Sequence, residues 1–141
     1  MLKKTIKYED FDGTIREEDF YFNLTKAELT EWQLSQEGGL DSMLERIVKE
    51  KKVPEIIKYL KEFILKAYGE KTEDGKRFMK SDDISHAFYC SAAYNELFME
   101  VVASPESAMA FINGLLPEDV RKQIAEQQKN AAQVETPNAE S

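Results

Sequence analysis

Hydrophobic and polar positions alternate near the start of the chain, which is the pattern of a half-buried β-strand. Strand-forming residues are frequent over residues 3–24, and Phe20 and Phe22 stand two apart, so that they would share one face of a strand. Asp12-Gly13 lies between the two halves of this segment, and an Asp-Gly pair is a strong signal for a two-residue type I′ turn. The pattern therefore predicts an N-terminal β-hairpin whose other face is acidic and solvated.

The rest of the chain changes to helical spacing, with apolar residues three and four apart. Thr25 and Glu28 form a capping-box pattern at the start of the first helix. Each later helix begins with a capping residue or with a proline suited to the first turn. The predicted helix starts after the first are Asp41, Pro54, Ser81 or Asp82, Ser91, Ser104-Pro105 and Pro117.

Glycine and polar sequence mark where helices should end. We expect Gly38-Gly39 to end the first helix and Gly69 to end the helix that Pro54 begins. The stretch from Gly69 to about Ser81 is polar and long, and is predicted to be a mobile connection.

These elements together predict the fold class α+β, with a short N-terminal β-hairpin followed by a mainly helical body. The hairpin covers residues 1–24, and the body covers residues 25–128 and forms one domain with it. Residues 129–141 contain one branched aliphatic residue and no aromatic residue, so they are expected to form a disordered tail.

Composition narrows the classes of function. The 141 residues suffice for one domain with a core, since 42% of them are hydrophobic. The formal net charge of -8 argues against nucleic-acid binding, because phosphates would repel the protein. The single cysteine, Cys90, excludes an internal disulfide and fits a reducing cytoplasm. No secretory signal and no apolar run of about 20 residues is visible, so neither export nor membrane insertion is expected.

Much of the negative charge lies early in the chain, where one stretch resembles a calcium-binding loop. With Gly13 at the sixth place of an EF-hand loop, Asp10, Asp12 and Asp19 fall on the third, fifth and twelfth places. However, Tyr8 stands at the first ligand place, and no helix is predicted to enter the loop. The hairpin explains the Asp-Gly pair, and no metal is expected here.

The remaining candidates for chemistry are few. Asp82, His86 and Cys90 stand four apart and would share a helix face, but three donors on one helix cannot surround zinc tetrahedrally without others. A structural role is favoured, with Cys90 as a small hydrophobe. The sequence has no phosphate-binding loop and no nucleophile motif. We therefore expect a binding protein that is not an enzyme and that needs no cofactor.

Successive segments of the chain resemble one known family. "DFDGTIREEDFYFNLTKAELTEW", "EGGLDSMLERIVKEK", "YGEKTEDGKRF" and "ELFMEV…AFINGLLPEDV" are similar to the tail assembly chaperones of long-tailed phages and prophages of Gram-positive hosts. The similarity runs from about residue 1 to residue 120. The similarity lies in the order of the segments and in their amino-acid sequences, because no single motif is a signature.

The resemblance implies a non-enzymatic role in the host cytoplasm. Such proteins bind the long, helical, aggregation-prone tape measure protein, bring tail tube subunits to it, and leave before the virion is complete. It thus implies two partners, the tape measure protein and the tail tube protein, and self-association of the chain is a further expected contact. Two other interpretations stay open at this point: a small acidic cytoplasmic adaptor or secretion-type chaperone for another helical protein, and a small metal-dependent enzyme or calcium sensor.

Our candidate for partner contact is the last apolar helical stripe. It consists of Phe111, Ile112, Leu115 and Leu116, and it precedes the predicted tail. An apolar stripe of this kind can cover a helical partner. The alternative is that the stripe only closes the core.

The resemblance also implies a programmed frameshift near the end of the gene, which would give a longer product. Gln128-Lys129-Asn130 can be encoded CAA AAA AAC, which contains the slippery heptamer A AAA AAC. A slip there would keep the folded body and replace the tail with a second module, through which the tail tube protein would mainly be recruited.

Overall fold

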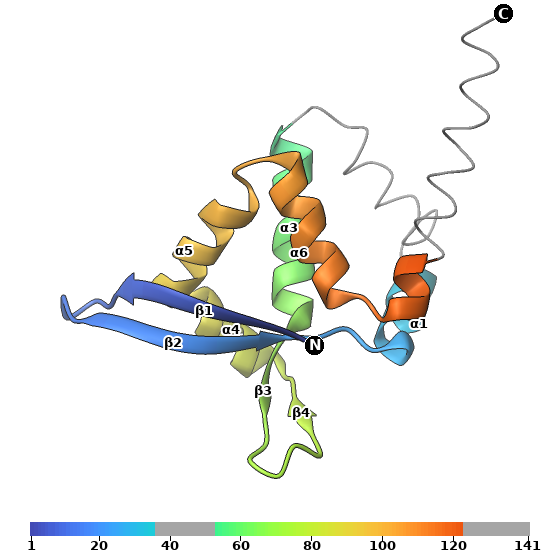
Figure 1. Ribbon diagram of the computed structural model, residues 1–141, viewed down its shortest axis with the longest axis horizontal. Helices are drawn as coiled ribbons and strands as arrows, with labels where there is room; N and C mark the ends of the chain where they lie inside the picture. Colours follow the sequence, from blue (N-terminus) through green and yellow to red (C-terminus); the bar gives the residue numbers. More distant parts are fainter. Residues whose placement is uncertain (36–52, 123–141) are drawn as a thin grey trace, which may run out of the picture.

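The computed structural model describes residues 1–35 and 53–122 of the chain. The first elements are strands β1 (Leu2–Glu9) and β2 (Ile15–Phe22), which pair in antiparallel register from Leu2 opposite Phe22 to Glu9 opposite Ile15. Figure 1 shows α3 (Val53–Ala67), α5 (Ala92–Val101) and α6 (Pro105–Leu115) rising on one side of this hairpin, with α4 (Asp82–Tyr89) behind the strands. The predicted α+β class with an N-terminal hairpin is confirmed.

The predicted type I′ turn at the tip of this hairpin is wrong. That turn needs positive φ at both central residues, but among the described residues only glycines have positive φ, here Gly13 at 83°. The loop is wider, because Asp10 Oδ1 accepts hydrogen bonds from the N–H groups of Asp12 and Thr14, each at 2.9 Å. Asp10 therefore organises the turn, and it is also held by the Arg16 guanidinium at 2.5 Å.

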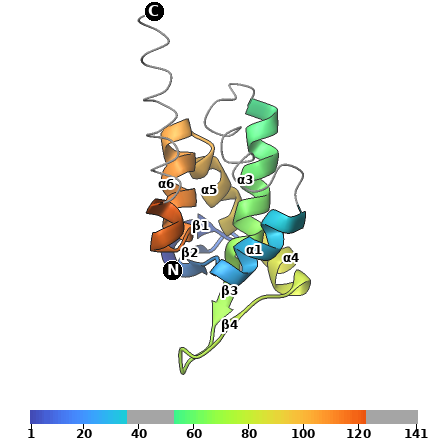
Figure 2. The same ribbon diagram turned by 90° about the vertical axis from the view of Figure 1, so that its right-hand side faces the viewer.

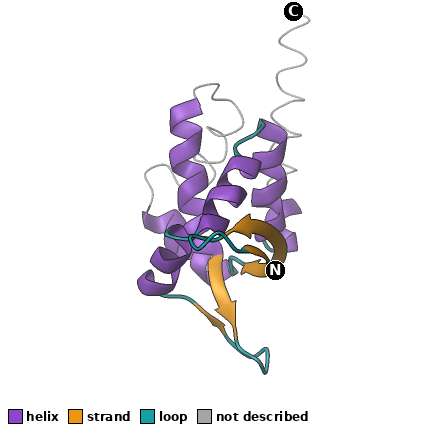
Figure 3. Cartoon of the chain, turned by 90° about the vertical axis from the view of Figure 1, so that its left-hand side faces the viewer, coloured by secondary structure: helices purple, strands orange, loops and turns teal. Residues whose placement is uncertain are grey.

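A second hairpin replaces the predicted mobile connection after residue 69. Strands β3 (Tyr68–Lys71) and β4 (Phe78–Met79) pair with each other, and β3 also pairs with β2 at Tyr21 and Phe22. The sheet order is β1-β2-β3-β4. The second hairpin points away from the helices (Figure 3). The sequence signal was present, since Asp74-Gly75 repeats the Asp-Gly pair of the first hairpin.

Gly69 has a different role from the one predicted. The helix before it ends at Ala67, and Gly69 lies inside β3. A Cβ atom on Gly69 would lie 2.7 Å from Phe78 Cε2 and 2.9 Å from the Met79 carbonyl oxygen. Glycine is needed because the two strands approach closely here, and not because a helix stops.

The described helices begin at the residues that their caps predict. Ser81, Ser91 and Ser104 each accept a backbone hydrogen bond at a helix start, and Thr25 and Glu28 form the reciprocal capping box at 3.0 and 3.2 Å. The helices are α1 (Lys26–Ser35), α3 (Val53–Ala67), α4 (Asp82–Tyr89), α5 (Ala92–Val101) and α6 (Pro105–Leu115). Residues 118–122 are also helical.

The core lies between the helices and the inner face of the hairpin. Phe22 is fully buried and makes edge-on contacts with Tyr68, Phe88 and Phe111, with ring centroids 5.5–5.7 Å apart. Leu60, Phe63 and Ile64 bring α3 into the same core. Figure 2 shows α1 beside one end of α3, where Trp32 packs edge-on against Phe63 at 4.6 Å.

Several predictions fall outside the described residues. They are the end of the first helix at Gly38-Gly39, the helix begun by Asp41, the last part of the helix towards Gln128, and the tail at 129–141. The proposed division into residues 1–24, 25–128 and 129–141 stays a prediction. The hairpin does share the buried core of the helices, through Ile6, Phe22 and Leu24.

Candidate functional site: a charged groove between three helices

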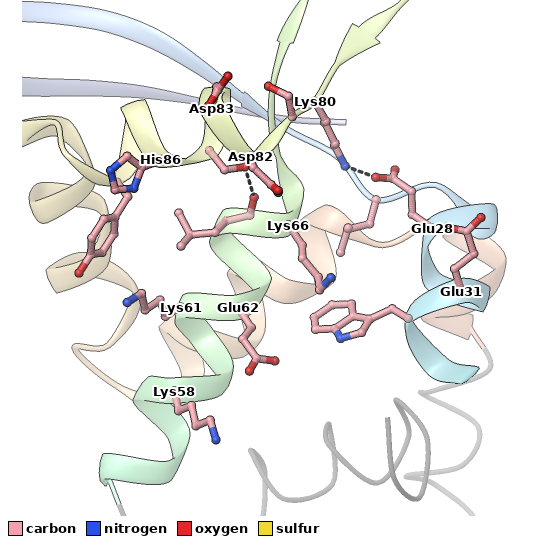
Figure 4. Close-up of a pocket in the computed structure, with 16 residues that line it drawn as sticks. Glu28, Glu31, Lys58, Lys61, Glu62, Lys66, Lys80, Asp82, Asp83 and His86 are labelled. Atoms are coloured by element: carbon pink, nitrogen blue, oxygen red, sulfur yellow. Dashed lines mark hydrogen bonds and ion pairs between the residues drawn. The ribbon is translucent and has the colours of Figure 1, made fainter. Parts of the chain in front are cut away.

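A groove of about 1140 Å³ lies between α1, the outer face of α3 and one side of α4. It exceeds the roughly 300–1,000 Å³ of a small-molecule pocket. Figure 4 shows the helices that form its sides. The residues that line it are Leu24, Glu28, Glu31, Trp32, Lys58, Lys61, Glu62, Leu65, Lys66, Lys80, Ser81, Asp82, Asp83, Ser85, His86 and Tyr89.

The apolar part of the groove comes from Leu24, Trp32 and Leu65. Leu24 and Trp32 belong to the buried core, and Leu65 packs against it half-buried. The Ser85 hydroxyl donates a hydrogen bond to the Leu65 carbonyl oxygen at 2.9 Å, which ties α4 to α3 beside this surface. The groove therefore has a fixed apolar surface that joins the core of the protein.

Two lysines of α3 lie over aromatic rings in the groove. Lys61 Nζ is 4.4 Å from the centroid of the Tyr89 ring, and Lys66 Nζ is 5.1 Å from the centroid of a Trp32 ring. Both distances suit a cation–π attraction. These contacts hold the lysine side chains along the groove, while Tyr89 stays 40% exposed.

Charges of opposite sign line different sides of the groove (Figure 4). The α3 side carries Lys58, Lys61 and Lys66, with Glu62 among them. The facing sides are acidic, with Glu28 and Glu31 from α1 and Asp82 and Asp83 from α4. A ligand that carries both signs of charge would match this arrangement.

Lys80 joins the start of α1 to the end of β4. Its ammonium donates to Glu28 Oε2 at 2.5 Å and to the Asn23 carbonyl oxygen at 2.6 Å. Desolvation, the largest single influence on Glu28, raises the pKa of its carboxyl group. The hydrogen bonds from Lys80 and Thr25 outweigh it, so the pKa is lowered from its ordinary value of 4.5. Glu28 thus caps α1 and fixes one end of the groove as a carboxylate.

The groove offers binding surface and little catalytic chemistry. Within residues 1–35 and 53–122, no group of three or more His, Cys, Asp or Glu side chains is placed to hold a metal ion. Its exposed groups are mainly lysines, carboxylates and one imidazole, around an apolar strip of which Leu24 and Trp32 are largely buried. An amphipathic helix has the matching properties, because its apolar face can lie on the strip while its charged flanks meet the two sides.

The predicted partner-contact residues are elsewhere, in the core. Phe111, Ile112, Leu115 and Leu116 are at most 5% exposed, and Phe111 packs against Phe22. In this conformation they close the core beneath the hairpin. This is the alternative to partner contact that the sequence left open. Contact between a partner and these four side chains in another conformation stays a prediction.

The structure also places the three candidate zinc ligands on α4. His86 Nε2 lies 3.5 Å from Cys90 Sγ, and His86 and Asp82 line the groove. The expectation that Cys90 behaves as a small hydrophobe is wrong. Cys90 is the exposed C-terminal cap of α4, because the helix ends just there and leaves its side chain at the surface.

Sequence reasoning missed the groove for a physical reason. Helical spacing places the α3 lysines on the side away from the core, and Trp32 is itself a buried core residue. Nothing in the local pattern shows that the lysines of α3 lie beside Trp32 of α1, because two helices must first be packed together. The recurrence of Lys58, Lys61 and Lys66 on one helix was the only available signal.

Comparison with known protein families finds a match. A family model described as phage tail assembly chaperone matches residues 1–141. No curated protein and no solved structure matches the chain. Among the described helices, none is long and apolar enough to cross a membrane.

Proposed function

The chain belongs to the phage tail assembly chaperone family, and from this premise we propose that it binds the tape measure protein during tail assembly and keeps it soluble. The observation that carries the proposal is the family match over residues 1–141. The role is that of a binding protein without catalysis. The partner is expected to be long, helical and prone to aggregation.

The groove between α1, α3 and α4 is the proposed contact surface. Leu24 and Trp32 are only 2% and 3% exposed, so the apolar stripe of a helical partner would lie mainly on Leu65 and the Tyr89 ring. The basic and acidic sides of the groove favour a helix with charges of both signs on its flanks. The lysines already lie over aromatic rings, so that less side-chain freedom is lost on binding.

A modest affinity at each groove fits the assembly process. Many copies bound along one tape measure protein hold it through their combined contacts, while each copy stays able to leave when the tube grows. The net charge of -8 favours the solubility of such an assembly.

The proposal extends to the setting of the protein. We place it in the cytoplasm of a Gram-positive host that carries a long-tailed phage or prophage, and we expect it to be absent from the finished virion. Recruitment of the tail tube protein would fall mainly to a longer, frameshifted product.

Co-expression with the tape measure protein of the same phage tests the proposal. The wild-type chain should raise the soluble fraction of that protein and copurify with it. The double variant Lys58→Glu/Lys61→Glu should fold but lose this effect, because it reverses charge on one side of the groove and removes the cation above Tyr89.

The matched control is Lys76→Glu/Arg77→Glu, which makes the same charge change on the β3–β4 hairpin, outside the groove. It should behave as the wild type. If the wild type leaves the tape measure protein insoluble, the proposed function is wrong. If the groove variant is as effective as the control, the function stands and the groove is not the contact surface.

A further inference from the structure

The two strands of the N-terminal hairpin carry opposite charge. β1 has Lys3, Lys4 and Lys7 against one acid, whereas β2 has Glu17, Glu18 and Asp19 against one arginine. Within the hairpin the opposite charges of the two strands face each other, since Lys7 lies opposite Glu17. The Thr5 hydroxyl also donates to Asp19 Oδ1 at 2.6 Å.

Neither outer edge of this hairpin is paired with another described strand along much of its length, although α5 packs against β1, where Lys4 pairs with Glu100 at 2.9 Å. In the described part of the chain, β1 pairs with β2 alone, and β2 pairs with β3 only at Tyr21 and Phe22. Residues 15–19 of β2 are exposed, and the tip of the hairpin projects beyond the helices (Figure 1). An open edge presents backbone N–H and C=O groups that can pair with another strand.

We propose that these edges join copies of this chain head to tail, with β1 of one copy adding to the free part of β2 of the next. The occupant of the acidic β2 edge is therefore the basic β1 edge of a second copy. The same cross-strand matches that hold the hairpin together, lysine beside glutamate and threonine beside aspartate, would be repeated between copies.

Charge also excludes the two symmetric alternatives. Pairing β1 with β1 would bring the lysines of two copies together, and pairing β2 with β2 would do the same with their acids. Like charges directly opposite each other destabilise a strand pair. Only the β1-to-β2 contact is favourable, and because it uses two different surfaces it does not close into a dimer and can continue as an open chain.

This inference concerns the isolated chain and does not depend on the tape measure protein. Sedimentation velocity at increasing protein concentration is the measurement. We expect the weight-average sedimentation coefficient to rise with concentration at about 20 mM salt and to rise less at about 500 mM, because exposed charges are screened. A wild-type chain that stays monomeric under both conditions overturns the proposal.

Charge-reversal variants identify the edges. Lys3→Glu/Lys7→Glu makes both edges acidic, and Glu17→Lys/Asp19→Lys makes both edges basic, so each variant alone should lose association. An equimolar mixture should regain it, because every contact between unlike variants is then complementary. Mixing leaves repulsion inside each hairpin unchanged, so recovery has to come from contact between copies. If the folded variants associate like the wild type, or if the mixture stays monomeric, the edges are not the interface.

Two single variants cover the case in which a double variant does not fold. Lys3 faces Tyr21 and Asp19 faces Thr5, so Lys3→Glu and Asp19→Lys place no like charges directly opposite each other within the hairpin. Each should weaken association alone, and the pair should regain it when mixed. Lys76→Glu, on the second hairpin, is the control and should associate as the wild type. Equal association by all three single variants contradicts the proposal.

Discussion

At the scale of single residues, Gly69 and Glu28 each have a structural role that another residue type would not fill equally well. Gly69 allows two strands to approach closely, and Glu28 caps a helix while it pairs with Lys80. Neither role follows from residue type alone. Each leads to a prediction that can be measured on the isolated protein.

Gly69→Ala should lower the free energy of unfolding by about 1–3 kcal/mol, the usual cost of overpacking a filled site. The added Cβ would meet the Phe78 ring at 2.7 Å and the backbone oxygen of Met79 at 2.9 Å. Gly114→Ala is the control, because its Cβ would meet only the flexible end of Leu2 at 3.2 Å and alanine favours the helix. Urea denaturation of both variants measures whether Gly69→Ala loses more unfolding free energy than Gly114→Ala. Equal stability would argue against the close approach.

Glu28 should make stability depend on pH in the acid range. Its pKa is lowered in the folded protein, so its contribution is fully present above the ordinary value of 4.5 and is lost as the pH falls through the lower folded value. Glu28→Gln should therefore be less stable than the wild type at pH 7. The difference between them should shrink below pH 4.5. Thermal melts across this range provide the measurement, and a constant difference would contradict the assignment.

At the scale of elements, α6 shows how an apolar stripe can be either a surface for a partner or part of the core. Its stripe fills the space beneath the hairpin, where Phe111 meets Phe22 and Leu24 N–H donates to the Leu115 carbonyl oxygen at 3.3 Å. The opposite side of the helix is exposed and carries Glu106, Ala110 and Asn113. Substitutions on the two sides should therefore differ sharply.

Leu115→Ala should cost about 2–5 kcal/mol of unfolding free energy, as expected for truncating a buried leucine. Asn113→Ala, on the exposed side of the same helix, should change it by less than about 0.5 kcal/mol. Chemical denaturation measures both. Near-equal values would mean that α6 is not held in the core in solution. In that case its stripe would be available to a partner.

At the scale of the whole molecule, every element that the structure describes lies before the candidate frameshift site at Gln128 to Asn130. A longer product made there would retain every described element. We predict that the gene has a slippery heptamer over codons 120–141 and an open −1 reading frame beyond it. The nucleotide sequence decides this. If either feature is missing, the model of two products fails for this gene, while the family assignment stands.

The sequence by itself determined the elements with strong local signals. The first hairpin, the capping box at Thr25 and the serine caps of α4, α5 and α6 all follow from interactions within a few residues. The pattern of Leu60, Ile64 and Ala67 likewise indicated which side of α3 is buried. Such features can be predicted because the residues that make them are close in the chain.

Only the tertiary structure decided which surfaces are free. Leu115 and Trp32 are apolar residues on helices, and local pattern does not distinguish core from partner surface for either. Packing buries Leu115 beneath the hairpin and buries Trp32 against Phe63, with Lys66 over a Trp32 ring. Most of the β2 edge likewise stays unpaired because β3 pairs only with the last two residues of β2. These outcomes depend on contacts between residues far apart in sequence, and a short-range pattern holds no information about them.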